Sequence, residues 1–285
     1  MKKIMGFLIG RYLSRKCRLR LGTLYVKFRY LLLFPLYVGD KYYCPFCGGR
    51  FRKMLSCGLD VPVLKEMKVV GAGYRANAIC PRCRSTDRER LLYVYLKNKR
   101  RIDTNGLKLL HVAPERNLQE ALMEYPNIDY VGGDLTLPLG DQQWVISIMI
   151  RMDITNIPCR DSVFDGIICS HVLEHVPDDC TAMCELFRVL KPGGWGILQV
   201  PISQCLDRTY EDIRIKTAKE REERFGQVDH VRIYGLDYED RLESAGFHVS
   251  VYSYAEEHGE SETSRYGLSR NEHVYVCTKP QNEGR

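Results

Sequence analysis

The sequence predicts an α/β protein in which a nucleotide-type domain follows a small cysteine-bearing module and a basic arm. Two observations support this prediction. Residues 164–201 run in the order strand, loop, amphipathic helix, glycine turn and strand, which is half of a doubly wound domain. Two C-x-x-C pairs precede that domain. We therefore expect three parts, with boundaries at 1–43, 44–104 and 105–285.

The segment from Phe164 to Pro201 is the most regular part of the chain. The apolar run at 167–169 is short, as in a strand that is covered on both faces. Four apolar residues then recur at helical spacing, namely Met183, Leu186, Phe187 and Leu190. The sequence KPGG at 191–194 predicts the end of this helix, with a glycine in the left-handed cap.

The motifs FDGIICSHVLEHV and LKPGG, in this order, resemble the latter half of the class I S-adenosylmethionine-dependent methyltransferases of the type 11-like group. The resemblance extends from about Leu107 to Thr278. It implies that 105–285 is a class I methyltransferase domain with a Rossmann-like seven-stranded sheet, which residues 248–254 and 273–278 close as an antiparallel pair. The alternative is a doubly wound domain that binds another nucleotide or none.

The first turn of the predicted donor site departs from the family pattern. The family has a glycine-rich turn after its first strand, where this chain has LLHVAPERN at 109–117. His111 stands at the usual acidic position, Ala113 at the first glycine and Glu115 at the second. The resemblance implies a tightened variant of the donor loop. Glu115 either binds the ammonium group of the donor or interacts with the dipole of the helix that follows.

Carboxylates follow two further predicted strands. Asp134 ends the strand at 130–134, which places the acid to bind the ribose hydroxyls of S-adenosylmethionine, and Leu135 follows it as a further donor-binding residue. Asp153 and Ile154 follow a strand predicted at 145–152 and stand where the family contacts adenine. An ordinary strand-end turn is the alternative for this last pair.

The loop after the fourth predicted strand completes the donor site. The resemblance implies that Ser170 and His171 line the region of the donor's sulfonium. Glu174 and His175 follow one turn later. The pattern favours a packing role for His175 over a role as a base.

Residues 202–237 form an insertion that we expect to cap the acceptor pocket. Its end carries Asp229, His230 and Arg232 close to a glycine. His230 could remove a proton from a hydroxyl while Asp229 orients it, and Arg232 could hold an anionic acceptor. The alternative is a structural hydrogen-bond cluster that closes the lid.

The cysteines Cys44, Cys47, Cys80 and Cys83 form two C-x-x-C pairs with 32 residues between them. Such pairs can place four thiolates around one structural Zn²⁺, with Zn–S distances near 2.3 Å. The stretches at 48–55, 61–65 and 68–79 are expected to form the strands and turns of a zinc ribbon. A redox pair is the alternative, and Cys57 is either a spare ligand or structural.

A second likeness concerns the residues after the ribbon. The arrangement CPxC followed by S-x-x-R-x-R-L-L at 85–92 resembles a group of bacterial methyltransferase-domain proteins that bear such a ribbon. The resemblance implies a connecting helix from this segment into the main domain.

Charge is unevenly distributed. Residues 1–105 carry 24 Lys and Arg against 6 Asp and Glu, although the net charge of the whole chain is only +6. The basic half either faces phosphates of lipid or nucleic acid, or is a solvated surface. The arm at 1–43 is too interrupted by charge to cross a bilayer, so it either lies on an anionic membrane or docks onto the protein itself. With no cleavable signal peptide visible, we expect a cytoplasmic protein, peripheral to the inner face of the membrane if the arm binds lipid.

The sequence thus favours a methyltransferase that uses S-adenosyl-L-methionine and structural zinc, acting on a small molecule or a glycan or lipid precursor. Methyl transfer from a sulfonium needs alignment and proton removal rather than a metal. One alternative is an RNA methyltransferase that holds phosphates with its ribbon and basic arm. Another is a non-catalytic adaptor whose altered first loop no longer binds the donor.

Overall fold

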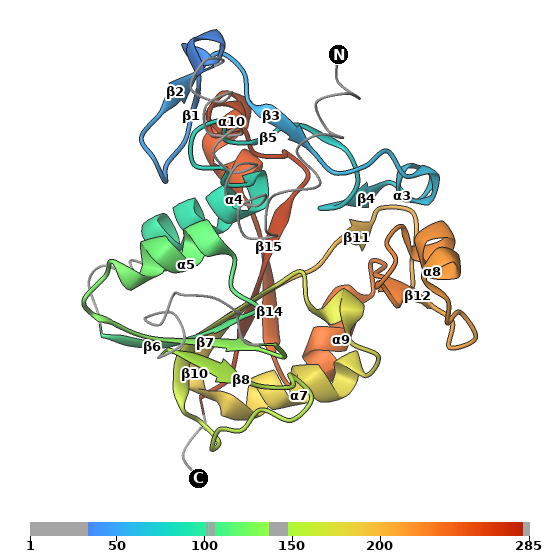
Figure 1. The fold of residues 1–285 in the computed structure, drawn as a ribbon. Helices are drawn as coiled ribbons and strands as arrows, with labels where there is room; N and C mark the ends of the chain where they lie inside the picture. The colour runs from blue at the N-terminus through green and yellow to red at the C-terminus, as the bar shows by residue number, and fades with distance from the viewer. Residues whose placement is uncertain (1–33, 101, 103–105, 137–147, 282–285) are drawn as a thin grey trace, which may run out of the picture.

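The computed structural model describes residues 34–100, 102, 106–136 and 148–281, and its centre is a seven-stranded sheet (Figure 1). The strand order is β14-β15-β10-β9-β6-β7-β8, and β15 runs antiparallel to both of its neighbours. The strands are β6 (Leu107–Val112), β7 (Ile128–Asp134), β8 (Met149–Arg151), β9 (Phe164–Ser170), β10 (Leu190–Gln199), β14 (His248–Ser253) and β15 (His273–Thr278). The predicted Rossmann-like seven-stranded sheet is confirmed. Of the strand expected at 145–152, residues 145–147 lie outside the described residues.

Helices cover both faces of this sheet. Neighbouring residues of a strand point to opposite faces, so adjacent apolar residues place apolar side chains on both faces, and each face is buried by helices. On β9, Ile167 packs in the core that α7 (Asp179–Val189) and α9 (Tyr238–Ser244) complete. Ile168 packs instead with α4 (Asp87–Tyr95) and α5 (Arg116–Met123). The predicted apolar stripe on α7 is confirmed for Met183 and Leu186, which are fully buried, and for Phe187, which packs against the same core. Leu190 is buried too, but it belongs to β10 and not to the helix.

The glycine turn after α7 differs from the prediction. The helix ends at Val189, and Leu190 is already extended with φ −77° and ψ 135°. Gly193 does have a positive φ of 76°, but it lies in a bulge of β10, where the register against β9 shifts. The predicted left-handed cap is therefore wrong. Backbone N–H groups of Ser162 and Val163 bind the last helical carbonyls and replace it.

The cysteine-bearing module consists of two small antiparallel ladders. β1 (Val38–Tyr43) pairs with β2 (Arg50–Phe51), and β3 (Leu55–Cys57) pairs with β5 (Arg75–Ile79). The prediction of a strand or turn at 61–65 is wrong, because Pro62–Glu66 forms the short helix α3. Proline is favourable in the first turn of a helix, where its missing N–H has no partner to lose.

The module is joined to the main sheet by hydrogen bonds from several elements. β4 (Val69–Val70) pairs with β11 (Ile202–Ser203), which follows β10. The side chain of Arg90, fully buried, donates to the carbonyl oxygens of Ala78 and Ser85 in the module, and of Tyr266 and Gly267. The last two follow α10 (Tyr254–Arg265), a helix the sequence did not predict, which lies beside β1 (Figure 1).

The insertion after β11 folds against the loop that follows β9. It contains β12 (Tyr210–Glu211), α8 (Ala218–Phe225) and β13 (Arg232–Ile233), the latter packed near the short 3₁₀ helix η3 (Leu173–His175). None of the helices in the described ranges is long and apolar enough to cross a membrane. Residues 1–33 of the arm predicted at 1–43 lie outside the described residues.

Candidate functional site

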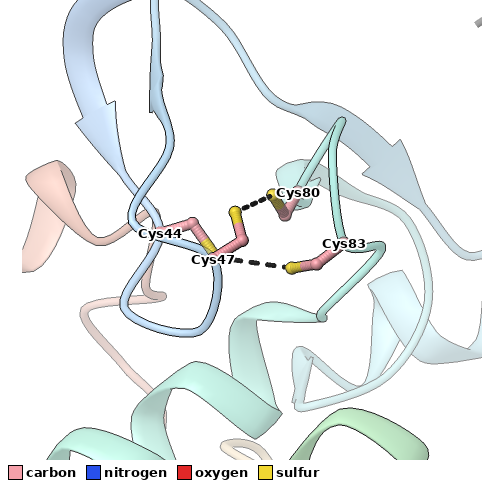
Figure 2. A group of neighbouring side chains, drawn as sticks. All are labelled: Cys44, Cys47, Cys80 and Cys83. Atoms are coloured by element: carbon pink, nitrogen blue, oxygen red, sulfur yellow. Dashed lines mark hydrogen bonds between the residues drawn. The ribbon is translucent and has the colours of Figure 1, made fainter.

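The four cysteines of the two C-x-x-C pairs converge on one point (Figure 2). The Sγ atoms of Cys44 and Cys83 are 3.5 Å apart, and those of Cys47 and Cys80 are 3.7 Å apart. Four Zn–S bonds of 2.3 Å in a tetrahedron place their sulfurs about 3.8 Å apart. The geometry therefore fits a four-coordinate metal ion, and the predicted Cys₄ cluster is confirmed.

Both knuckles have the same backbone turn. The N–H of Gly48 binds the carbonyl of Cys44, and the N–H of Arg84 binds that of Cys80. In each pair the fourth residue after the first cysteine thus turns back toward it, with a positive φ of 65° at Gly48 and 68° at Arg84. Cys57 lies elsewhere, in the wall of a cavity described below.

On the donor side, His111 connects the first strand to the turn that follows it. Its imidazole is fully buried, and lies 2.9 Å from both the Glu115 carboxylate and the Tyr130 hydroxyl. Burial alone would raise the pKa of Glu115, but the hydrogen bond and charge of His111 outweigh burial and lower it. Ser170 lowers it further. Glu115 is therefore an ionised carboxylate at the end of β6, facing the end of β9.

Ala113 holds the conformation that the family assigns to glycine. Its φ is 45°, in the left-handed region that an L-residue adopts only under constraint. Its N–H donates to the carbonyl of Gly133 at 2.7 Å, which fixes the turn against β7. The altered sequence thus keeps the tight turn that the resemblance implied.

The two acidic strand ends lie at the same edge of the sheet. Asp134 accepts hydrogen bonds from the backbone N–H and hydroxyl of Thr136, and Asp153 does the same with Thr155. The backbone and hydroxyl bonds of Thr155 lower the pKa of Asp153. Because both turns leave the other carboxylate oxygen free of these bonds, each side chain keeps an acceptor for a ligand.

The apolar partners of these acids differ from each other. Leu135 is 61% exposed, whereas Ile154 is 7% exposed and belongs to the core under β8. Leu135 thus offers the larger uncovered apolar surface of the two.

His171 lies where β9 ends, with a φ of 55°. Its N–H donates to the carbonyl of Gln199, and its Nδ1 lies 3.2 Å from the Glu174 carboxylate. Burial, assisted by Arg88 and Arg75, lowers the pKa of His171 well below its ordinary value. The imidazole is therefore neutral.

A cavity of about 560 Å³ opens between the cysteine-bearing module and the loops beside β9. Its polar wall contains His171, Glu174, His175 and His230 from the main domain, and Arg75 and Arg88 from the module. Arg75 is paired with Asp87, whereas Arg88 donates to the carbonyl of Gly71. The sequence did not predict the two arginines, although Arg88 belongs to the S-x-x-R-x-R pattern.

Two carboxyl groups near this wall are fully buried. Burial raises the pKa of Glu174 to about 8 and that of Glu272 to about 7. Glu272 accepts a hydrogen bond from the Gln199 amide. Neither residue was assigned a role from the sequence, because nothing in the local pattern shows that the fold buries it.

The predicted trio at 229–232 is brought together only in part. The ring of His230 lies 4.7 Å from that of His175 and lines the cavity, while burial lowers the pKa of His230 to about 4. The Asp229 carboxylate lies 3.3 Å from Nδ1 of His175, so Asp229 contacts that ring and does not orient His230 as predicted.

Arg232 is not among the residues that line the cavity. Its guanidinium, 2% exposed, donates to the carbonyl oxygens of Leu173, Val176 and Pro177 and to Glu211. These bonds fix η3 to β13. For Arg232 the geometry favours the structural alternative over binding of an anionic acceptor.

The comparisons with known proteins agree with this arrangement. Residues 108–198 match the family described as methyltransferase domain. The chain contains a methyltransferase domain. Over 42 residues it is 48% identical to a demethylmenaquinone methyltransferase from Streptomyces avermitilis, a match that covers 15% of this chain and 18% of that protein.

Two solved structures are similar to this chain at low sequence identity. One is a Burkholderia thailandensis 1,6-didemethyltoxoflavin-N1-methyltransferase with bound S-adenosylhomocysteine (14% identity, TM-score 0.47, 68% of this chain and 78% of that one). The other is a SAM-dependent methyltransferase from Archaeoglobus fulgidus (12% identity, TM-score 0.43, 69% and 96%). The fold of the methyltransferase domain rests on its own strand order rather than on these likenesses.

Proposed function

We propose that this protein is an S-adenosylmethionine-dependent methyltransferase, with the donor at the carboxyl edge of β6 to β9 and the acceptor in the neighbouring cavity. The observation that carries the proposal is the family match over residues 108–198, because it contains all four of these strand ends. In open α/β sheets, ligands bind at this edge.

The residues at that edge fit the donor's chemical groups. Asp134 is assigned to the ribose hydroxyls, and Asp153 to the adenine amine, with Leu135 and Ile154 as apolar neighbours. The ionised Glu115 is placed to offset the ammonium of the donor, between Ala113 and Ser170. When bound, the donor supplies a methyl group on a positively charged sulfur, and the residues of this chain align it with the acceptor.

The cavity supports a polar acceptor. Histidine side chains and two arginines in one wall suit a small molecule, or the head of a glycan or lipid precursor, with oxygen substituents. His230 faces this space, but its pKa of about 4 makes it a weak base for a hydroxyl. Binding fits this side chain better than proton removal.

Structural zinc is the second part of the proposal. Four thiolates complete the coordination of Zn²⁺ and leave no open position for chemistry. The sulfurs belong to the same module whose other residues line the cavity, so the ion stabilises one wall of the acceptor site. An anionic membrane surface as partner of residues 1–43 stays a proposal from the sequence; sedimentation with vesicles containing phosphatidylserine tests it.

Calorimetry with S-adenosylhomocysteine tests donor binding. We expect a binding heat that Asp134→Asn weakens about tenfold, the equivalent of one hydrogen bond. Asp129→Asn on the same strand is the matched control, since its carboxylate pairs with Lys108 away from the site. A wild-type protein that gives no heat contradicts the proposal and supports a non-catalytic adaptor.

A further inference from the structure

Three metal-ligating side chains meet in the wall of the cavity, apart from the cysteine cluster. Glu174 and His175 come from η3, and His230 comes from the loop before β13. One ligand atom from each lies within 4.8 Å of the other two. Bonds of 2.0–2.2 Å to one ion place ligand atoms about 3.4 Å apart. The ligand atoms must therefore move closer together than 4.8 Å to bind one ion.

Glu174 needs a partner that the described residues do not supply. The residue is 2% exposed, and its Oε1 lies 3.2 Å from His171. Its Oε2 is buried and has no hydrogen-bond partner among the described residues. A buried carboxyl oxygen without a partner is unfavourable, and a bound cation is one way to satisfy it.

The surroundings hold the three side chains in place. Asp229 lies 3.3 Å from Nδ1 of His175, an arrangement that fixes the ring and leaves Nε2 for a ligand. The N–H of Val231 donates to the carbonyl of Glu174, which ties the two contributing loops together. Arg232 binds three carbonyls of the η3 loop from the other side.

The charge around the site is mixed. Arg88 lies in the same cavity wall, and its positive charge disfavours the binding of a metal cation nearby. Asp229 offsets this charge, and Arg88 is itself held by the carbonyl of Gly71. Two carboxyl groups and two imidazoles thus lie around the three candidate ligand atoms.

We propose that Glu174, His175 and His230 bind a divalent first-row transition metal ion, with an open position toward the cavity. Two imidazoles and one carboxylate suit Zn²⁺, Co²⁺, Ni²⁺ or Fe²⁺ better than Mg²⁺ or Ca²⁺. Three protein ligands leave room for a further one, and all three line the cavity. At this open position the ion would bind an oxygen atom of the methyl acceptor, a role that rests on the proposed function.

Titration of the chelator-stripped full-length protein with Co²⁺ alone tests the site. We expect two equivalents, one with the intense sulfur-to-cobalt charge-transfer absorption of the cysteine cluster and one without it. His230→Ala and Glu174→Gln are expected to lose the second equivalent and keep the first. His248→Ala, an exposed histidine on β14, is the matched control and keeps both.

The outcomes separate this proposal from the proposed function. A wild-type protein that binds one equivalent, through sulfur alone, overturns the second site, as does a His230→Ala variant that still binds two. The wild-type titration decides the matter even if a variant fails to fold. The Co²⁺ titration contains no donor, so its result does not depend on whether the protein binds S-adenosylhomocysteine. The metal site and the proposed function can therefore fail separately. Asp229→Asn is expected to weaken the second equivalent by about 10- to 100-fold, as a residue that positions a ligand.

Discussion

The imidazole of His111 joins Glu115 to Tyr130 through two hydrogen bonds of 2.9 Å each. A carboxylate only accepts, so the Nε2–H of His111 donates to Glu115, while Nδ1 on the other side of the ring shares a hydrogen bond with the Tyr130 hydroxyl. His111 thereby holds the turn that would otherwise depend on glycines.

Replacing His111 with Ala is expected to lower the free energy of unfolding by about 2–3 kcal/mol. The change leaves the carboxylate of Glu115 and the hydroxyl of Tyr130 without their buried partner. Urea denaturation measures the effect, and His248→Ala serves as the exposed control. An unchanged midpoint for His111→Ala contradicts a structural role for this imidazole.

Arg232 is expected to be the more sensitive position in the 229–232 loop. Arg232→Ala removes the donors to three backbone carbonyls and leaves Asp179 and Glu211 with one cationic partner fewer. Breaking a buried pair lowers the free energy of unfolding by about 3–5 kcal/mol.

The matched control for Arg232 is Arg214→Ala. Arg214 makes an exposed ion pair with Asp212, and because such pairs contribute little to stability, the Arg214→Ala variant is expected to keep the wild-type unfolding midpoint. Equal midpoints for the two variants, measured in urea, argue against the structural assignment of Arg232.

The seven-stranded sheet was implied by the family resemblance, whereas its buried strands and the cysteine cluster were predictable because their signals are local. Ile167 and Ile168 are adjacent apolar residues, and the two C-x-x-C spacings are complete motifs in themselves. The orientation of Arg232 was not predictable. Whether its guanidinium points to an acceptor or to the carbonyls of η3 depends on packing between segments about 55 residues apart.

The cavity was hidden from the sequence for the same reason. Arg88 and His230 are far apart in the chain and meet only because the module folds onto the main domain. The bulge at Gly193 is a different case. A glycine after a helix commonly caps it, but here the last carbonyls of α7 accept hydrogen bonds from the N–H groups of Ser162 and Val163 in the loop before β9.

Removal of metal from the cysteine cluster is expected to lower the thermal stability of the whole chain. Metal binding at a Cys₄ site contributes directly to folding, and Arg90 couples the module to Tyr266 and Gly267. Cys80→Ser should lower both the bound zinc and the melting temperature, whereas exposed Cys205→Ser should change neither. Full zinc content in Cys80→Ser, determined by mass spectrometry, contradicts the assigned ligand set.

Glu272 makes stability depend on pH. Burial raises its pKa from 4.5 to about 7, so the folded protein binds a proton that the unfolded chain has released. Stability is therefore highest below pH 4.5 for this group and falls as the pH rises through about 7, by up to about 3 kcal/mol. Glu272→Gln keeps the acceptor for Gln199 and removes the charge, so it should flatten this part of the profile.

The measurement is urea unfolding at a series of pH values from 5 to 8, with exposed Glu239→Gln as the matched control. The control should retain the wild-type slope, because the side chain of Glu239 is exposed on α9 and lies apart from the buried carboxyl of Glu272. The Glu272→Gln variant should gain stability relative to wild type at pH 8 and little at pH 5. A difference between the two proteins that is the same at both pH values shows that the buried carboxyl does not titrate in this range, and the assigned shift is then wrong.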